Sequence, residues 1–177
     1  MHYTLFDTAI GTCGIVWNER GLIGVHLPDT THARTRASVT HRFAGAEPAD
    51  PPPDVQHAID GIVALLRGEK RDLREIALDY GRVPEFNRRV YELARTIGPG
   101  ATLTYGEIAQ RLGGPGTARA VGQALGQNPW PIIVPCHRVL AADGGMGGFS
   151  APGGVATKRR MLEIEGVEGV RPFLRLF

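Results

Sequence analysis

Hydrophobic and polar positions at the start of the chain follow a pattern that is typical of short strands. Residues 4–8 read as a strand, and the apolar runs 15–17 and 22–27 flank a polar turn that contains Gly21, which predicts a β-hairpin. We therefore expect the chain to begin with a small antiparallel sheet.

Helical spacing of apolar residues follows this hairpin. It predicts one helix over residues 31–43 and a second helix that Asp54 caps and Gly68 ends. Residues 44–53, which end in three consecutive prolines, should form a loop. Residues 73–78 are expected to add one more strand, so the N-terminal part is predicted to be an α+β unit.

The C-terminal part of the chain has mostly helical patterning. Apolar residues recur at helical spacing over 86–97, and Thr104 with Glu107 three residues later makes a capping box for a helix over 105–112. A buried apolar run is expected at 132–134. These features favour helices packed around a short apolar segment.

A second helix closely follows the capped one. A tight turn at 113–116 leads to Thr117, which can cap a helix over 118–125, and this arrangement is the outline of a helix-turn-helix. The small residues of the second helix suit either close approach to a DNA groove or close packing inside the protein. A glycine-rich loop at 143–154 and a last helix at 155–165 complete the prediction.

These patterns predict an α+β fold with two domains, at residues 1–83 and, with the helix-turn-helix, at residues 84–177. No apolar run reaches the roughly 18 residues that a membrane span needs. The N-terminus lacks the basic and apolar regions of a secretory signal. Two distant cysteines are typical of a reducing compartment, so we expect a cytoplasmic protein without a membrane segment.

Charge is distributed unevenly between the two parts. Residues 1–85 contain 9 Lys/Arg and 12 Asp/Glu, whereas residues 86–177 contain 11 and 6, which gives net charges of −3 and +5. A basic C-terminal part is a modest indication of a polyanionic partner, and chance explains the difference about as well.

Cys136 and His137 are the residues that could carry covalent chemistry. A thiol attacks as the thiolate, and the adjacent imidazole could serve as its base, directly or through a water. The histidine would need a carboxylate to fix its tautomer, for which Glu163 and Glu165 are candidates. On spacing alone, two unrelated residues at the edge of the core explain the pair at least as well. Metal-ligand spacing is missing, and Cys13 is most simply a buried small side chain.

A series of linked motifs extends this interpretation. Residues 133–139 (Ile-Val-Pro-Cys-His-Arg-Val) resemble the active-site motif of the O6-alkylguanine-DNA alkyltransferases, also called methylated-DNA–protein-cysteine methyltransferases. Further matching motifs occur in the family order at residues 104–109, 118–122, 128–129, 147–150, 158 and 162–166. Together they cover residues 84–167, so the resemblance is specific. The N-terminal part resembles the family only in length and strand-rich outline, which implies a ribonuclease H-like domain.

The resemblance implies a role for each matched catalytic residue. Cys136 would be the alkyl acceptor, His137 the base that acts through a water, and Glu165 the carboxylate that orients the base. Asn128 would brace the active-site turn, and Tyr105 would give a proton to N3 of the leaving guanine.

Other matched residues would bind the substrate or the DNA. Arg119 would fill the gap left by the extruded nucleotide, and the small residues Ala120 and Gly122 would permit close approach to the minor groove. Phe149 would wall the pocket and Ser150 would donate a hydrogen bond near O6. The remaining residues of this substrate-binding group are Arg138 and Val139. The backbone carbonyls of Cys136 and Val139 would accept hydrogen bonds from the exocyclic amine of guanine.

The implied activity is DNA repair by direct reversal. The thiolate would take an alkyl group from O6 of guanine, with O4 of thymine left open as a second position, and each molecule would act once because a thioether resists hydrolysis. The partner would be double-stranded DNA containing O6-alkylguanine, bound by a monomer. No metal or organic cofactor is implied, and the zinc-ligand pattern of some members is missing from this sequence.

Two other interpretations stay open at this point. A non-catalytic relative would bind alkylated DNA without transfer, although such relatives lack the cysteine that is present here as Cys136. A thiol hydrolase would use Cys136 and His137 on a small ester, and would leave Tyr105 and Arg119 without a role. Residues 151–157 form a slightly longer loop than is usual in the family, which leaves the substrate size preference undetermined.

Overall fold

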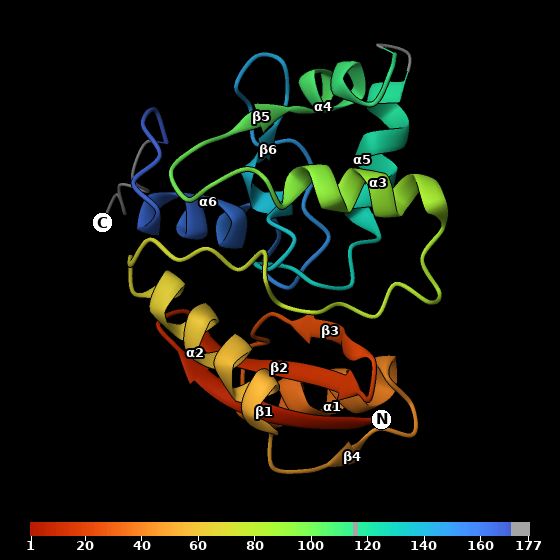
Figure 1. Cartoon of the computed structure of the whole chain (residues 1–177). Coiled ribbons are helices and arrows are strands. Elements are labelled where there is room, and N and C mark those ends of the chain that lie inside the picture. The colour runs from red at the N-terminus through yellow and green to blue at the C-terminus, as the bar shows by residue number, and fades with distance from the viewer. Residues whose placement is uncertain (115–116, 171–177) are drawn as a thin grey trace, which may run out of the picture.

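The computed structural model of the protein describes residues 1–114 and 117–170. Its sheet and helices α1 and α2 lie together in one half of the molecule, and helices α3 to α6 lie in the other (Figure 1). This mixed α+β architecture confirms the predicted class. In chain order, the elements are β1 (His2–Thr8), β2 (Gly11–Asn18), β3 (Gly21–His26), α1 (His32–Arg42), β4 (Glu47–Pro48), α2 (Pro53–Leu66), α3 (Glu85–Ala94), β5 (Leu103–Thr104), α4 (Tyr105–Arg111), α5 (Ala118–Gly126), the 3-10 turn η2 (Cys136–Arg138), β6 (Val139–Leu140) and α6 (Gly154–Ile164).

The main sheet has the strand order β3-β2-β1-β4, in which the first three strands are antiparallel and β4 runs parallel to β1. The predicted hairpin is confirmed as β2 and β3. The short strand β4 lies inside the segment 44–53 that we predicted as a loop. Backbone pairing forms it, because the N–H groups of Glu47 and Ala49 donate to the carbonyls of Met1 and Tyr3.

Alternate residues of β2 point to opposite faces of the sheet. Ile15 and Trp17 belong to the main hydrophobic core, which also contains apolar residues of α2. Val16 packs instead with Tyr3 and with Val39 of α1 in a second, small cluster. The helices α1 and α2 therefore cover opposite faces of the sheet.

One predicted helix cap is correct and two predicted caps are not. The capping box of Thr104 and Glu107 begins α4 as expected. Helix α2 begins at Pro53, so Asp54 lies in its first turn and does not cap it. Thr117 precedes α5, but its hydroxyl donates to a carbonyl of the preceding turn at 2.8 Å. Residues 115–116 of the predicted turn lie outside the described residues.

Residues 73–78 are buried where we predicted, but they do not form the predicted strand. Leu73, Ile76 and Leu78 face the core, and the only ladder contact in this described segment is an isolated bridge from Leu78 to β3. Nη2 of Arg95 donates to the carbonyls of Leu73, Arg74 and Ile76 at 2.9, 2.9 and 2.8 Å. Because a guanidinium occupies these carbonyls, no neighbouring strand is needed to satisfy them.

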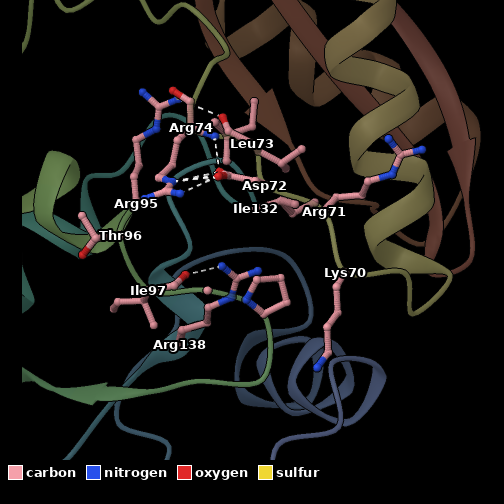
Figure 2. A pocket seen from close by; sticks show the side chains of 13 residues that line it. Lys70, Arg71, Asp72, Leu73, Arg74, Arg95, Thr96, Ile97, Ile132 and Arg138 are labelled. Carbon is pink, nitrogen blue, oxygen red and sulfur yellow. Dashed lines mark hydrogen bonds and ion pairs between the residues drawn. The ribbon is translucent and has the colours of Figure 1, made fainter.

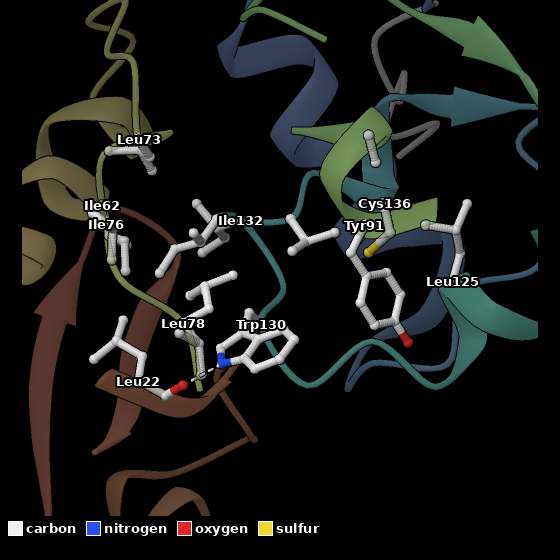
Figure 3. Packing of buried hydrophobic residues seen from close by; sticks show 14 of the residues in the cluster. Leu22, Ile62, Leu73, Ile76, Leu78, Tyr91, Leu125, Trp130, Ile132 and Cys136 are labelled. Carbon is white, nitrogen blue, oxygen red and sulfur yellow. Dashed lines mark hydrogen bonds between the residues drawn. The ribbon is translucent and has the colours of Figure 1, made fainter. Parts of the chain in front are cut away.

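One continuous core joins the two halves (Figure 3). Trp130, from the segment after α5, donates its Nε1–H to the carbonyl of Leu22 in β3 at 2.8 Å. Its ring makes T-shaped contacts with Tyr80 and Tyr91, with ring centroids 5.3 and 6.0 Å apart. Within residues 1–114 and 117–170, no helix combines the length and the hydrophobicity that crossing a membrane requires.

Candidate active site

The loop between α5 and η2 places Cys136 and is held in shape by Asn128. The Asn128 side chain donates to the carbonyl of Val134 at 2.9 Å and accepts from the N–H of Trp130 at 2.9 Å. Between them, Ile132 adopts a φ of 78°, which is costly for a β-branched residue and is tolerated here because its side chain is buried in the core. Asn128 thus links both ends of the segment 130–134 that leads to Cys136.

His137, the residue after Cys136 in the chain, is buried and contacts Glu165. Its Nε2 lies 2.8 Å from Oε1 of Glu165, the residue that ends α6. Nδ1 is also buried and has no hydrogen-bond partner among the described residues. Glu163, the other candidate carboxylate, makes no contact of this kind with His137 in the part of the chain that the structure describes.

The electrostatics of this pair define the tautomer of the imidazole. Burial raises the pKa of Glu165, but its hydrogen bonds with His137 and Arg138 outweigh that effect and lower the pKa to about 2. Burial lowers the pKa of His137, against the opposing effect of Glu165. A neutral imidazole beside a carboxylate carries its proton on Nε2, so Nδ1 is left as a proton acceptor.

Lys158 is a buried cation close to Cys136 that sequence reasoning treated only as a matching position. Its Nζ donates to the carbonyl of Val139 at 2.6 Å and lies 5.8 Å from the ring centroid of Tyr105. Burial lowers its pKa to about 8, while the charge on Cys136 acts to raise it. The signal was available, because Lys158 is spaced three and four residues from the buried Met161 and Leu162 of α6.

The Cys136 thiol experiences opposing influences. Burial raises its pKa, whereas a hydrogen bond from Asn128 and the positive charge of Lys158 lower it. A thiol in this environment depends on its neighbours to form a thiolate. Burial and the nearby Cys136 also raise the pKa of Tyr105, so the phenol keeps its proton and can donate it.

A cavity of about 1120 Å³ opens beside the thiol. Tyr105 from the start of α4, Phe149 and Ser150 from the long loop, and segments of the N-terminal half all contribute to its wall. The predicted site residues that line it are Tyr105, Arg119, Gly122, Asn128, Cys136, Phe149 and Ser150. The sequence therefore located seven of the residues that line this cavity, including the nucleophile and the aromatic wall.

Helix α5 borders the cavity and presents small residues and an arginine. The side chain of Arg119, in the first turn of α5, is exposed. A Cβ added at Gly122 would lie 3.9 Å from the Tyr105 ring, so the glycine keeps this wall close but not crowded. Ala120 is half-buried and does not line the cavity.

Three of the predicted binding residues have other partners in the structure. Arg138 is buried and does not line the Cys136 cavity, because its guanidinium donates to both Glu165 oxygens at 2.9 and 2.8 Å. The carbonyl of Val139 accepts from Lys158, and the hydroxyl of Ser150 donates to the carbonyl of Gly126 at 3.0 Å. Arg138 therefore holds Glu165 in place behind His137.

Within the described ranges 1–114 and 117–170, no three His, Cys, Asp or Glu side chains gather as metal ligands would. Cys13 is buried and burial raises its pKa to about 12, which keeps it protonated.

The fold and site together define a class of protein: a carrier of one buried cysteine nucleophile, backed by a histidine and a carboxylate, beside a pair of short helices. A family model described as "6-O-methylguanine DNA methyltransferase, DNA binding domain" matches residues 85–167. The chain belongs to the methylated-DNA–protein-cysteine methyltransferase family, as its relatives show.

Relatives cover most of the chain. It is 36% identical over 154 residues to the methylated-DNA–protein-cysteine methyltransferase of Methanothermobacter thermautotrophicus, covering 87% of this chain and 79% of the relative. It is 36% identical over 165 residues to the protein of the same name from Mycobacterium tuberculosis, covering 93% and 92%.

Solved structures resemble the structure of this protein over most of the chain. A crystal structure of Mycobacterium tuberculosis OGT in complex with DNA superposes with a TM-score of 0.75 at 36% identity, covering 93% of this chain and 92% of that chain. The O6-methylguanine-DNA methyltransferase of Pyrococcus kodakaraensis gives a TM-score of 0.69 at 30% identity, covering 93% and 99%.

Proposed function

We propose that this protein repairs DNA by direct reversal, transferring an alkyl group from O6 of guanine in duplex DNA to Sγ of Cys136. The observation that carries this proposal is the contact of His137 with Glu165 at 2.8 Å, next in the chain to a cysteine that lines a cavity with Tyr105 on its wall. The relatives are named as methyltransferases of methylated DNA, and one related structure contains DNA.

The reaction divides into two proton transfers and one displacement. Nδ1 of His137 accepts the thiol proton through a water, while Glu165 stabilises the imidazolium that forms. The thiolate attacks the alkyl carbon in line, the carbon–O6 bond breaks, and its electron pair passes to guanine. Tyr105 donates a proton to N3 of the departing base and recovers one from solvent, to which the His137 imidazolium releases the thiol proton. These steps balance without a metal or an organic cofactor.

Residues around this centre support the same reaction. Lys158 favours the thiolate by its charge, and Asn128 holds the cysteine loop. Phe149 walls the base pocket, and the backbone at Ser150 is available near O6, since the Ser150 hydroxyl already donates to Gly126. The product is a thioether, so each molecule acts once.

Helices α4 and α5 would bind the DNA as a helix-turn-helix. The second helix, with Ala120 and Gly122, would enter the minor groove, where degenerate base edges suit an activity that ignores sequence. Arg119 would occupy the gap left when the alkylated nucleotide is flipped into the cavity.

At the level of the chain, we propose an N-terminal domain at 1–83 and a C-terminal domain at 84–177. The strand order β3-β2-β1-β4, with β4 parallel to β1, supports a ribonuclease H-like description of the first. We further propose a monomer that acts in the cytoplasm, since the two cysteines are both free and buried.

The direct test is to incubate the protein with duplex DNA containing one O6-methylguanine and to weigh the intact protein and its peptides. We expect one methyl group on the peptide that contains Cys136, at no more than one equivalent per protein. The matched variant Cys136→Ser should gain no mass, and Cys13→Ser should behave as the natural protein does. Folded protein without methylation of the Cys136 peptide would refute the function.

A further inference from the structure

A second cavity, of about 300 Å³, has Arg138 in its wall (Figure 2). It is formed between the segment 70–74 that follows α2 and the segment 95–99 that follows α3, with Ile132 and Ile133 between them. None of its lining residues lines the cavity beside Cys136. Alkyl transfer as proposed above makes no use of it.

The wall of this cavity is strongly cationic. Its charged lining residues are Lys70, Arg71, Arg74, Arg95 and Arg138, against the single carboxylate of Asp72. Like charges gathered around a partly enclosed space raise the local concentration of anions.

Carboxylates nearby neutralise only part of this charge. Asp72 pairs with Arg74 at 2.6 Å, and Glu165 pairs with Arg138 at 2.8 Å. Glu69 lies 3.6 Å from Arg71 in a longer, exposed pair, which is correspondingly weak.

Lys70 and Arg95 keep an unbalanced charge. Among the described residues, neither forms an ion pair with a carboxylate. The cavity and its paired carboxylates therefore carry a net charge of about +2, which matches a dianion.

Arg95 also has an unused donor. Its Nη2 is committed to three backbone carbonyls of the segment 73–76. Its Nε is buried and has no hydrogen-bond partner among the described residues. Leaving a buried charged donor unpaired is unfavourable, so an anion in the adjoining cavity would stabilise the charge of Arg95.

We propose that this cavity binds a small phosphate-bearing dianion, either inorganic phosphate or a phosphomonoester. Its volume is at the small end of ligand sites and suits a compact ligand. Arginine donors and a mobile lysine are the side chains that bind phosphoryl oxygens. A phosphodiester of duplex DNA fits less well, because it carries one negative charge and is attached to a wide double helix.

The test is isothermal titration calorimetry of the full chain with inorganic phosphate, in chloride buffers of constant ionic strength. The test variant is Lys70→Gln with Arg71→Gln, both on the exposed rim. The control variant is Arg67→Gln with Arg82→Gln, which removes the same charge from exposed positions that do not line the cavity. Arg95 is left unchanged, because it holds the backbone of residues 73–76.

We expect saturable binding of one phosphate to the natural protein and to the control variant, and an affinity at least about tenfold weaker in the test variant. Absence of saturable binding, or an equal loss in both variants, would overturn the proposal. If a duplex oligonucleotide displaces phosphate, and the test variant binds that duplex more weakly than the control, the cavity belongs to a DNA contact and the small-anion proposal fails. The titration does not use alkyl transfer, so its failure leaves the proposed function untouched.

Discussion

At the scale of single residues, the chemistry of Cys136 depends on what stands behind His137. Glu165 is buried, accepts hydrogen bonds from Arg138, and contacts Nε2 of His137 at 2.8 Å. Its charge is therefore fixed before a proton leaves the thiol. This arrangement makes the carboxylate a positioning and charge-stabilising group that does not itself reach the substrate.

Replacing that carboxylate tests its role. Glu165→Gln should slow transfer from free O6-benzylguanine by about 100-fold, because the imidazolium loses its counter-charge and the tautomer is no longer fixed. It should also cost about 3–5 kcal/mol of stability, because Arg138 is left buried and unpaired. Second-order transfer rates and urea denaturation measure the two effects, with circular dichroism showing that the variant is folded.

The same helix supplies a matched control. Glu163→Gln makes the same change of charge two residues away, without touching His137, and should leave the rate within about twofold. Glu165→Asp keeps the charge and should recover part of the lost rate. Equal rates for the Glu163 and Glu165 variants would contradict the assignment.

Lys158 should make the free energy of unfolding depend on pH. Its pKa is lowered from 10.5 to about 8, so the unfolded chain binds more protons than the folded protein between these values. The free energy of unfolding of the natural protein should therefore rise by about 3 kcal/mol from pH 8 to pH 10.5 relative to Lys158→Met. Denaturation of both proteins across this range measures the difference.

Two further measurements test whether Lys158 acts as a buried ammonium group. Lys70→Met, at an exposed lysine, should track the natural protein in a phosphate-free buffer. Lys158→Met should also move the pH dependence of alkyl transfer to higher pH, because the pKa of Cys136 loses the lowering effect of that charge. A stability difference that does not change with pH would refute the buried-ammonium interpretation.

Sequence reasoning reached the reactive residues here but not all of their partners. Cys136, His137 and Glu165 came from linked motifs, and the structure brings them together. Lys158 was noted only as a matching position, because a lysine is ordinarily assumed to be exposed even where it falls on the apolar stripe of a helix. Arg138 was predicted at the substrate, whereas its guanidinium points to Glu165, a contact between distant residues that no local pattern encodes.

At the scale of elements, α5 carries the prediction that separates DNA handling from chemistry. Arg119 is exposed in its first turn and lines the cavity, whereas the chemistry occurs at Cys136. Arg119→Ala should slow transfer from duplex DNA by about 10- to 100-fold, because nucleotide flipping costs a few kcal/mol that the arginine offsets. Transfer from the free base should change little.

The matched control for Arg119→Ala is a substitution of another exposed arginine. Arg111→Ala removes an exposed charge from the end of α4 without altering the cavity wall. It should weaken duplex binding slightly and leave the ratio of duplex to free-base rates unchanged. Equal slowing of both substrates by Arg119→Ala would count against its part in flipping.

The helices and strands show where local sequence is sufficient to predict an element. Thr104 and Glu107 begin α4 as predicted, because a capping box depends only on neighbouring residues. Residues 73–78 have the apolar pattern of a strand and the burial to match, but Arg95, distant in sequence, takes their carbonyls. Strand β4 was not predicted, because backbone groups alone make its pairing with β1 and its side chains give no strand pattern.

At the scale of the whole molecule, the two predicted domains share one core. Trp130 from the C-terminal half donates to Leu22 in the sheet and packs against Tyr80 and Tyr91. Packing is thus continuous across the proposed boundary between residues 83 and 84. A boundary in the chain does not require two independent folding units when apolar area is buried between them.

This shared core predicts that the molecule unfolds in one step. Trp130→Phe should cost about 2–4 kcal/mol, because a buried hydrogen bond is lost, which leaves the Leu22 carbonyl only the N–H of Asp79, and a small void forms. The variant retains Trp17 in β2 as its one remaining tryptophan, of two in the chain, and its fluorescence reports the sheet. Hydrogen exchange of α5 peptides reports the other half at the same urea concentrations.

The Trp17 fluorescence and the hydrogen exchange of α5 should give the same urea midpoint, and Trp130→Phe should lower both equally. The reason is that, in a shared core, the loss of either half destabilises the other. Trp17→Phe is the matched control: it leaves Trp130 at the junction as the reporter, and its fluorescence should follow the same single transition. If α5 stays protected from exchange after the Trp17 signal is lost, the halves unfold separately. The cysteine site would then survive without the sheet, and residues 84–177 alone should accept an alkyl group.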